Sequence, residues 1–331
     1  MKRDHLLIIG VLHPLGRELT RQLRKIYGTS RVITADLSGM PDRSFDGEPY
    51  EVLDLLDKDS LSRIISRRDI TQIYLLATGD RGALPDGSEE IEKVSLLGLL
   101  NVLEVAREKG VARVFWPSSV SVFGADAPRW KCPQDVRLDP STPHGLSRMT
   151  GESWCRHYWE RFAVDVRSLR YPGILGAGVP AGELTDYVGD MLQHALLGQT
   201  YHCYLQENAI LPMIYMPDAV RAAIEVMEAP ATAISVRDAY NIGAISVSPR
   251  EIALTIQRYV PGFKVEYQPD HRQRMAEETP MSVEDIAAVR DWRWDYSYGI
   301  SETVRDMLAH LSAEMKPMSV HVRELNGAVF F

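Results

Sequence analysis

A histidine and an arginine lie four residues apart near the start of a predicted helix. The helix is predicted over residues 143–162, because Thr142 is a favoured capping residue and Pro143 suits a first helical turn. His144 and Arg148 therefore project from one side of the helix, at the end where free backbone N–H groups make the potential positive. A histidine in this setting is a candidate general acid or base, and the arginine adds a permanent positive charge beside it.

The elements that must position this pair alternate along the chain. Short apolar runs predict strands, and the amphipathic segments between them predict helices. The predicted strands cover residues 5–9, 31–35, 50–53, 72–76, 112–116 and 164–170, and the predicted helices cover residues 15–27, 60–66, 89–108 and 143–162. Alternating βα units of this length predict an α/β fold with a Rossmann-like, doubly wound parallel sheet.

The pattern changes after Gly173, where glycine and proline become more frequent. We expect residues 1–173 to form a Rossmann-like nucleotide-binding domain. Residues 174–314 are expected to form mainly a smaller C-terminal substrate-binding lobe, followed by a tail over residues 315–331. Later segments near residues 211–243 are expected to return to the first domain.

Composition restricts the partners of the chain. Of its 331 residues, 45% are hydrophobic and 25% are charged, as in an ordinary globular enzyme. The net charge of −8 disfavours nucleic acid and anionic membranes as partners, so a small-molecule substrate is expected. The apolar run near the N-terminus is too short for a signal peptide, and no later run reaches membrane-spanning length, which indicates a cytoplasmic protein. The three cysteines show no metal-type spacing, so we expect no metal site.

Several segments together resemble the extended short-chain dehydrogenase/reductases, and most closely the short-chain type of L-threonine 3-dehydrogenase. They are NVLEVAREKGVARVFWPSSVSVFG, GESWCRHYWERFAVDVRSLRYPG, LTDY, LPMIYMPDAVRA and PDHRQRMAEETP, and they are in register over almost the whole chain. The resemblance implies NAD as the cofactor. It also implies a homodimer formed by the helices over residues 89–108 and 143–162, with Leu97 and Trp159 as outward-facing residues.

The nucleotide loop departs from the family pattern. The family reads G-x-x-G-x-x-G, whereas this chain has Gly10, His13 and Gly16 at the three positions. The imidazole of His13 is expected to crowd the approach of a pyrophosphate. The alternatives are that the ring swings outward, that it donates to a phosphate, or that it closes a vacant pocket. Asp36 matches the acid that binds the adenosine ribose, which implies NAD rather than NADP, and Asp54 matches an adenine contact. The alternatives are a solvated strand end for Asp36 and a turn residue for Asp54.

The catalytic pair also departs from the family pattern. The family uses Tyr-x-x-x-Lys, and this chain has His144 and Arg148 at those positions. A tyrosine must have its pKa lowered strongly to act at neutral pH, whereas histidine ordinarily titrates near neutrality. Arg148 keeps the positive charge but cannot relay a proton as lysine does. The resemblance therefore predicts His144 as the acid or base, and the alternative is a structural histidine.

Hydroxyl and charged side chains complete the predicted site. Ser119 matches the hydroxyl that bonds the substrate carbonyl or alcohol in the family, and Ser118 competes for that role, although serines at a strand end are also typical of a turn. Thr279 stands where threonine dehydrogenases usually carry tryptophan, so the pocket is expected to differ. The further predicted substrate residues are Asp80, Arg81, Thr185, Asp186 and Tyr187.

Three functions are open from the sequence. The first is an NAD-dependent oxidoreductase acting on a small polar amino-, hydroxy- or keto-acid-like substrate, with His144 replacing tyrosine. The second is a non-redox lyase, isomerase, dehydratase or cyclase on the same scaffold, without NAD turnover. The third is a catalytically silent homologue. Ordinary L-threonine dehydrogenation is the least favoured, because the glycine loop and both catalytic positions are changed.

Overall fold

A seven-stranded parallel sheet forms the larger part of the molecule. The computed structural model describes residues 4–37, 48–77, 89–177 and 184–315. The strands are β1 (Leu6–Ile9), β2 (Val32–Asp36), β3 (Tyr50–Val52), β4 (Gln72–Leu75), β5 (Arg113–Ser119), β6 (Val166–Tyr171) and β10 (Tyr240–Asn241). Their order across the sheet is β10-β6-β5-β4-β1-β2-β3. The predicted Rossmann-like α/β fold is therefore confirmed.

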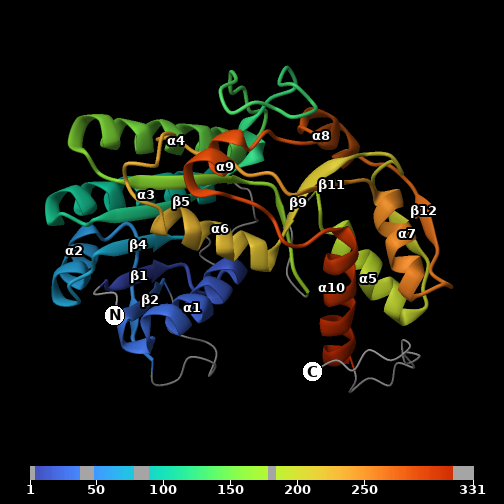
Figure 1. Cartoon of the computed structure of the whole chain (residues 1–331), viewed down its shortest axis with the longest axis horizontal. Coiled ribbons are helices and arrows are strands. Elements are labelled where there is room, and N and C mark those ends of the chain that lie inside the picture. Colours follow the sequence, from blue (N-terminus) through green and yellow to red (C-terminus); the bar gives the residue numbers. More distant parts are fainter. Residues whose placement is uncertain (1–3, 38–47, 78–88, 178–183, 316–331) are drawn as a thin grey trace.

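Helices cover both faces of this sheet, because its strands are apolar on both sides (Figure 1). One face packs against α1 (Pro14–Tyr27), α6 (Met216–Glu228) and α9 (Ile286–Trp292). The other face packs against α2 (Lys58–Arg67), α3 (Glu89–Lys109) and α4 (Pro143–Phe162). The two apolar clusters between these layers form the core that fixes the strand ends.

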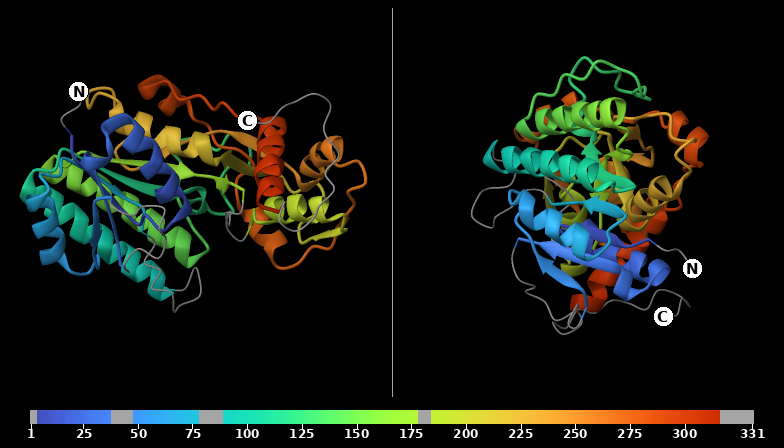
Figure 2. Two further views of the ribbon diagram at one scale, coloured as in Figure 1. Left: turned by 90° about the horizontal axis from the view of Figure 1, so that it is seen from below. Right: turned by 90° about the vertical axis from the view of Figure 1, so that its left-hand side faces the viewer.

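A smaller lobe is built mainly from the C-terminal part of the chain. It contains a three-stranded sheet, β7 (Gly173–Leu175), β9 (Leu211–Tyr215) and β11 (Ile245–Val247), and a pair, β8 (Tyr201–Cys203) and β12 (Val265–Tyr267). Its helices are α5 (Tyr187–Leu197), α7 (Pro249–Tyr259), α8 (Arg272–Glu278) and α10 (Ile300–Met315). Figure 2 shows these elements grouped at one end of the molecule, away from the N-terminal strands.

The segment over residues 211–243 divides between the two parts. β10 pairs with β6 in the main sheet, and α6 packs on the face that α1 also covers. β9 instead pairs with β7 and β11 in the smaller sheet. The chain therefore crosses between the parts more than once.

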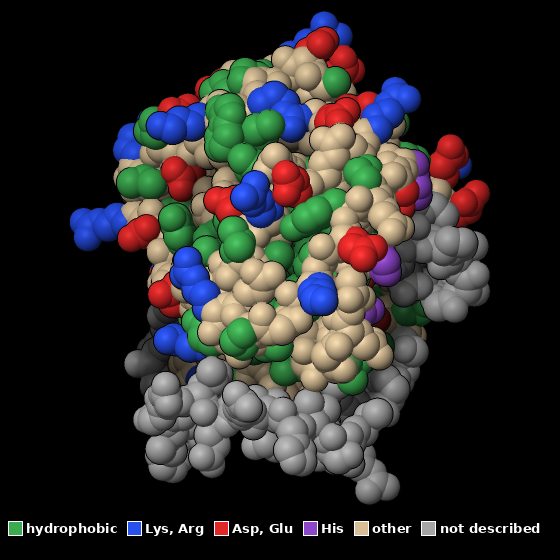
Figure 3. All heavy atoms as spheres, turned by 90° about the vertical axis from the view of Figure 1, so that its right-hand side faces the viewer, with side chains coloured by type: hydrophobic (Ala, Val, Ile, Leu, Met, Phe, Trp, Pro, Cys, Tyr) green, Lys and Arg blue, Asp and Glu red, His purple; other side chains and the backbone are tan. Residues whose placement is uncertain are grey.

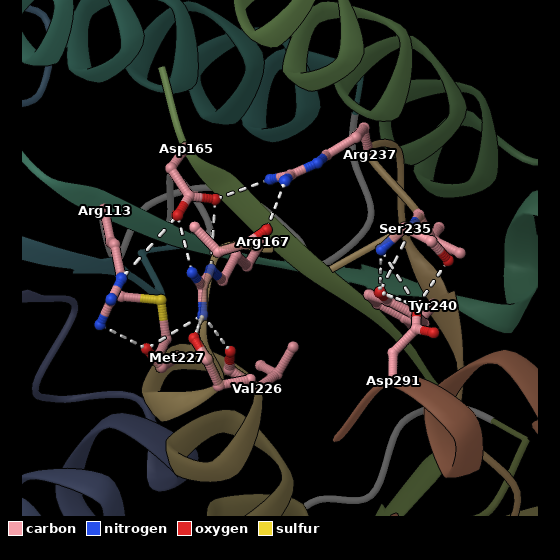
Figure 4. A network of polar contacts seen from close by, with 12 residues as sticks. Arg113, Asp165, Arg167, Val226, Met227, Ser235, Arg237, Tyr240 and Asp291 are labelled. Carbon is pink, nitrogen blue, oxygen red and sulfur yellow. Dashed lines mark hydrogen bonds and ion pairs between the residues drawn. The ribbon is translucent and has the colours of Figure 1, made fainter. Parts of the chain in front are cut away.

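Buried charges connect the end of α6, and the segment before β10, to β6 and the residue before it (Figure 4). The guanidinium of Arg167 on β6 donates to the carbonyl oxygens of Val226 and Ala229 at the end of α6, at 2.6 and 2.7 Å. Asp165 accepts from Arg167 at 2.7 Å and from Arg237 at 2.8 Å. Because the last carbonyl groups of a helix have no partners within the helix, Arg167 satisfies the end of α6.

The described helices and one face of the surface were compared with the expectations from composition. Among the helices that the structure describes, none combines the length and apolar character that crossing a membrane requires. Figure 3 shows acidic and basic side chains interspersed over the face formed by the C-terminal lobe.

Candidate active site

The sheet order reverses beside β1, which pairs with both β2 and β4. In parallel sheets of this kind, ligands bind outside the carboxyl ends of the strands, near such a reversal. The predicted residues at this edge are Gly10 after β1, Asp36 at the end of β2 and Ser119 at the end of β5. This edge is therefore the candidate active site.

The start of α4 is held against the end of β5. Thr142 caps the helix by accepting the N–H of Gly145 at 3.1 Å, as predicted from the sequence. A β-carbon on Gly145 would lie 2.2 Å from the carbonyl oxygen of Ser121, which follows β5 in a short 3-10 helix, Val120–Val122. Only glycine allows this approach, and it brings His144 close to the serine-containing turn.

His144 forms a pair with a buried carboxylate from another helix. Its Nδ1 lies 2.8 Å from Oε1 of Glu92 in the first turn of α3. The side chain of His144 is 39% exposed and that of Glu92 is 9% exposed. Burial by itself would raise the pKa of Glu92, but the hydrogen bond and charge of His144, together with Arg148 and Ser147, lower it below its ordinary value. Glu92 is therefore ionised at neutral pH and fixes the orientation of the imidazole.

The side chain of Arg148 is directed into the protein and not toward solvent. Its side chain is buried over the ring of Trp116, 5.2 Å from the ring centroid, and it donates to the carbonyl oxygen of Pro117 at 3.0 Å. Burial lowers the pKa of Arg148, and the negative charge of Glu92 opposes that shift. The arginine therefore acts as a buried counter-charge to Glu92 and does not occupy the place of an exposed lysine.

The two candidate serines point in opposite directions, because neighbouring residues of a strand face opposite sides of the sheet. Ser118 is buried and donates to Glu152 at 2.5 Å, and Glu152 also pairs with Arg170 at 2.8 Å. Ser119 is partly exposed, and its hydroxyl accepts the N–H of Ser121 at 3.2 Å. This geometry favours Ser119 over Ser118 as a substrate contact and gives Ser118 a structural role.

Sequence reasoning missed two residues at this site. Glu92 lies on the buried face of α3 with Ser95 and Leu99, so a carboxylate at an otherwise buried helical position was the available signal. Ser121 has a buried hydroxyl oxygen without a partner among the described residues. In the sequence, Ser121 could have been noticed as a further serine two residues after Ser119. Periodicity, however, cannot show that the start of α4 packs against this residue.

The two glycines of the nucleotide loop are required by the structure. Gly10 has a φ of +94°, and a β-carbon there would lie 2.4 Å from the backbone nitrogen of Ala77. A β-carbon on Gly16 would lie 2.2 Å from the carbonyl oxygen of Gly10. The loop is therefore closed tightly between β1 and α1, as a dinucleotide loop requires.

The carboxylates near the loop are bound to backbone groups. Asp36 accepts the N–H of Leu12 at 3.0 Å through Oδ2 and the N–H of Leu37 at 2.8 Å through Oδ1. Asp54 accepts the N–H of Leu56 at 2.9 Å. Each carboxylate oxygen retains acceptor capacity. Asp36 is thus fixed beside the loop, where it fits the ribose of NAD. Asp54 lies in the turn after β3, and its adenine contact stays a prediction.

His13 lies at the start of α1, where the diphosphate of a dinucleotide would be expected. Its backbone is extended, with φ −66° and ψ 139°, and its Nδ1 accepts the N–H of Leu15 at 3.2 Å. Pro14 has no N–H to offer. The glycines and Asp36 fit NAD, but the first turn of α1 does not fit its diphosphate in this arrangement.

The predicted substrate residues of the C-terminal lobe lie in different environments. Thr185 is buried against Gly173, and Asp186 immediately precedes α5. Tyr187 is fully buried in the apolar core of that lobe, which argues against direct contact with substrate. Thr279 ends α8 and donates to the carbonyl oxygen of Met275 at 2.9 Å. The predictions for Asp80 and Arg81 lie outside the described residues.

The cysteines and acidic residues were compared with the arrangement that a metal ion requires. Among the residues that the structure describes, no group of three or more His, Cys, Asp or Glu side chains is arranged to hold a metal ion. Cys132, Cys155 and Cys203 are free and buried, and burial raises the pKa of the Cys132 and Cys203 thiols to about 11. These cysteines are packing residues.

Comparison with known proteins gives consistent matches along the chain. The NAD dependent epimerase/dehydratase family model matches residues 6–243. A mitochondrial L-threonine 3-dehydrogenase from Sus scrofa is 36% identical over 92% of this chain and 82% of its own length. The holo form of a GalE-like L-threonine dehydrogenase from Cupriavidus necator is 42% identical, with a TM-score of 0.86, over 93% of this chain and 100% of that chain. An L-threonine dehydrogenase structure from Clostridium difficile is 35% identical, with a TM-score of 0.87, over 94% and 98%.

Proposed function

Because the chain belongs to the NAD dependent epimerase/dehydratase family, as an extended short-chain dehydrogenase/reductase related to the threonine dehydrogenases, we propose that it is an enzyme that moves protons through His144. The contact between His144 Nδ1 and Glu92 supports this proposal most directly. The proposed substrate is a small polar amino-, hydroxy- or keto-acid-like compound, because its relatives are named as threonine dehydrogenases.

The histidine and glutamate form an acid–base pair. With Nδ1 directed at the carboxylate, Nε2 is the nitrogen that remains for substrate. As a base, Nε2 takes a proton from the substrate, and the negative charge of Glu92 stabilises the imidazolium that forms. As an acid, the imidazolium returns the proton to product. Glu92 positions the ring and does not touch the reacting atoms.

Hydroxyl groups on the turn that meets the start of α4 complete the proposed mechanism. Ser119 lies at the end of β5, and the backbone carbonyl of Ser121 packs against Gly145, the residue after His144. A hydroxyl group is suited to orient a substrate carbonyl or alcohol oxygen while the adjacent base acts. Arg148 keeps Glu92 ionised from the buried side of the pair.

The reaction class divides into two candidates. Oxidation of a substrate alcohol needs NAD as the hydride acceptor, and the loop glycines and Asp36 support this candidate. Non-redox lyase, isomerase, dehydratase or cyclase chemistry needs only the acid–base pair, and the capped first turn of α1 favours it. We rank the two as equal on these observations and place a silent homologue third, because it leaves the paired histidine without a use.

The first experiment separates these candidates. Purified protein is incubated with a panel of small amino, hydroxy and keto acids, with and without NAD, and conversion is followed by mass spectrometry and by absorbance at the wavelength of NADH. Conversion that depends on NAD supports oxidation, and conversion without it supports the non-redox class. His144→Phe is expected to reduce either conversion at least 100-fold. Unchanged conversion by His144→Phe would falsify the proton-transfer role, and no conversion of any compound would favour the silent homologue.

A further inference from the structure

The first turn of α1 offers few backbone donors to a ligand. In a strand–loop–helix unit of this kind, a diphosphate is bound by free N–H groups at the helix N-terminus. Pro14 supplies none, and the N–H of Leu15 is already donated to Nδ1 of His13 at 3.2 Å. The N–H of Arg17 forms the ordinary first bond within the helix, to the carbonyl oxygen of His13 at 2.9 Å. Two of the positions that supply free N–H groups at a helix N-terminus, residues 14 and 15, are therefore without a donor or already occupied.

The backbone at position 13 does not require a histidine. Its φ of −66° and ψ of 139° are open to any residue, unlike the φ of +94° at Gly10. Since Nδ1 accepts a hydrogen bond, the proton of the neutral ring is on Nε2, and Nδ1 itself cannot donate to a phosphate in this arrangement. The ring takes the position on the Leu15 N–H that a phosphate oxygen would take.

The other parts of the loop are suited to a dinucleotide. Gly10 and Gly16 close the loop tightly, and Asp36 is held beside it by Leu12. The obstacle is therefore confined to one turn of one helix. We propose that His13 is a self-capping residue that competes with the diphosphate of NAD or ADP-ribose for the Leu15 N–H, and so sets the dinucleotide affinity of this chain well below what the glycines and Asp36 permit.

Binding measurements test this competition without any knowledge of the substrate. The dissociation constants of ADP-ribose and of adenosine are measured by calorimetry for the wild type, His13→Ala and His13→Asn. Alanine keeps the β-carbon and removes the ring, whereas asparagine keeps a side-chain oxygen that can cap the helix. His13→Ala is expected to bind ADP-ribose about tenfold more tightly, equivalent to about 1.4 kcal/mol. His13→Asn is expected to remain near the wild type, and adenosine binding is expected not to change.

A second substitution extends the test along the same turn. Pro14→Gln, added to His13→Ala, supplies a further N–H and is expected to tighten ADP-ribose binding several-fold more. Circular dichroism checks that each variant is folded. If His13→Ala is not folded, His13→Gly gives the same measurement, because glycine is tolerated at a helix cap.

Three results would overturn the proposal. Weaker ADP-ribose binding by folded His13→Ala would mean that His13 is itself a phosphate ligand. Equal affinity, or no measurable binding, would mean that the ring does not limit the affinity. An equal gain for adenosine would place the effect outside the diphosphate position. Because the measured quantity is binding and not turnover, each result is independent of the proposed role of His144.

Discussion

At the scale of residues, the proposed proton transfer depends on a few side chains at the candidate site. His144 and Arg148 could be recognised from the sequence, because their spacing and the cap at Thr142 place them at a helix start. Glu92 could not, since it lies 52 positions before His144 and only the packing of α3 on α4 joins them. Periodicity identifies a buried position, but it does not identify the residue that faces it.

Removal of the Glu92 charge is expected to lower turnover more than it changes substrate binding. Glu92→Gln can still bond the imidazole but cannot stabilise the imidazolium, so kcat should fall about 10- to 100-fold with little change in KM. The pH profile of kcat should also move. The matched control is Glu89→Gln, an exposed carboxylate in the same turn of α3, which pairs only loosely with Lys93 at 3.5 Å. Equal losses in both variants would rule out the positioning role of Glu92.

The same substitution has a predictable effect on stability. The pKa of Glu92 is lowered in the folded protein, so its ionised form contributes stability above the ordinary value of 4.5, and this contribution is lost as the pH falls through the lowered pKa. We expect Glu92→Gln to be less stable than the wild type by about 1–2 kcal/mol at pH 7. The difference should shrink below pH 4.5. Urea denaturation at several pH values measures it, and a difference independent of pH would contradict the assignment.

The two neighbouring serines should separate catalysis from stability. Ser119→Ala is expected to lower kcat with little effect on folding, because its hydroxyl lies at the exposed end of β5. Ser118→Ala removes a buried donor to Glu152 and should cost about 1–3 kcal/mol of folding free energy. The turnover and the urea denaturation of both variants are measured, so that the effect on kcat and the effect on folding free energy can be compared for each serine. The opposite pattern would show that Ser118, and not Ser119, faces the substrate.

At the scale of elements, close packing between α4 and β5 holds the histidine in place. A β-carbon on Gly151 of α4 would lie 2.2 Å from the ring of Trp116, which is itself buried under Arg148. Gly151→Ala should therefore destabilise the protein by about 1–3 kcal/mol, although alanine favours helices. The control is Gly189→Ala in α5, where a β-carbon meets no described atom within 4 Å, and a gain of up to about 1 kcal/mol is expected. Thermal unfolding distinguishes the two, and a stabilised Gly151→Ala would refute the packing argument.

Most elements of the main sheet were predictable, because apolar runs and caps determine them locally. The expected strand at residues 112–116 is β5, but β5 continues through Pro117 to Ser119, since it pairs with β6 as far as Tyr171. The elements missed were short ones of the C-terminal lobe, including β8 and β12. Strands of three residues carry too little periodicity to be recognised, and their pairing depends on contacts between distant segments.

At the scale of the whole molecule, the outer faces of α3 and α4 carry exposed apolar side chains. Leu97 is exposed as expected, but Trp159 is half-buried against Arg237, 3.5 Å from the guanidinium carbon to the ring centroid. The large exposed hydrophobic side chains of α4 are instead Leu146, Trp154 and Phe162, and each is turned by about 80° around the helix from the one before. Exposed apolar side chains on these two neighbouring helices are suited to pack against their own copies in a symmetric pair.

We therefore predict a dimer through these helices, with twice the chain mass of 37.3 kDa. Trp154→Glu would place a charge in that contact and should give monomers in analytical ultracentrifugation. Leu254→Glu is the control, because Leu254 is similarly exposed but lies on α7 in the C-terminal lobe. A wild type that sediments as one chain at micromolar concentration, or equal dissociation of both variants, would contradict the prediction.

The contact between Glu92 and His144 also limits the order in which substitutions can convert this site to the tyrosine type. A tyrosine placed at position 144 would face a buried carboxylate, which raises the pKa of a phenol and disfavours the phenolate. Under the proposed proton transfer, His144→Tyr alone is therefore expected to be inactive. Replacing Glu92 first leaves the histidine without its partner but introduces no repulsion. To replace His144 by the tyrosine of the family pattern, the substitution at Glu92 on α3 should accordingly come first, although Glu92 is far in sequence from position 144.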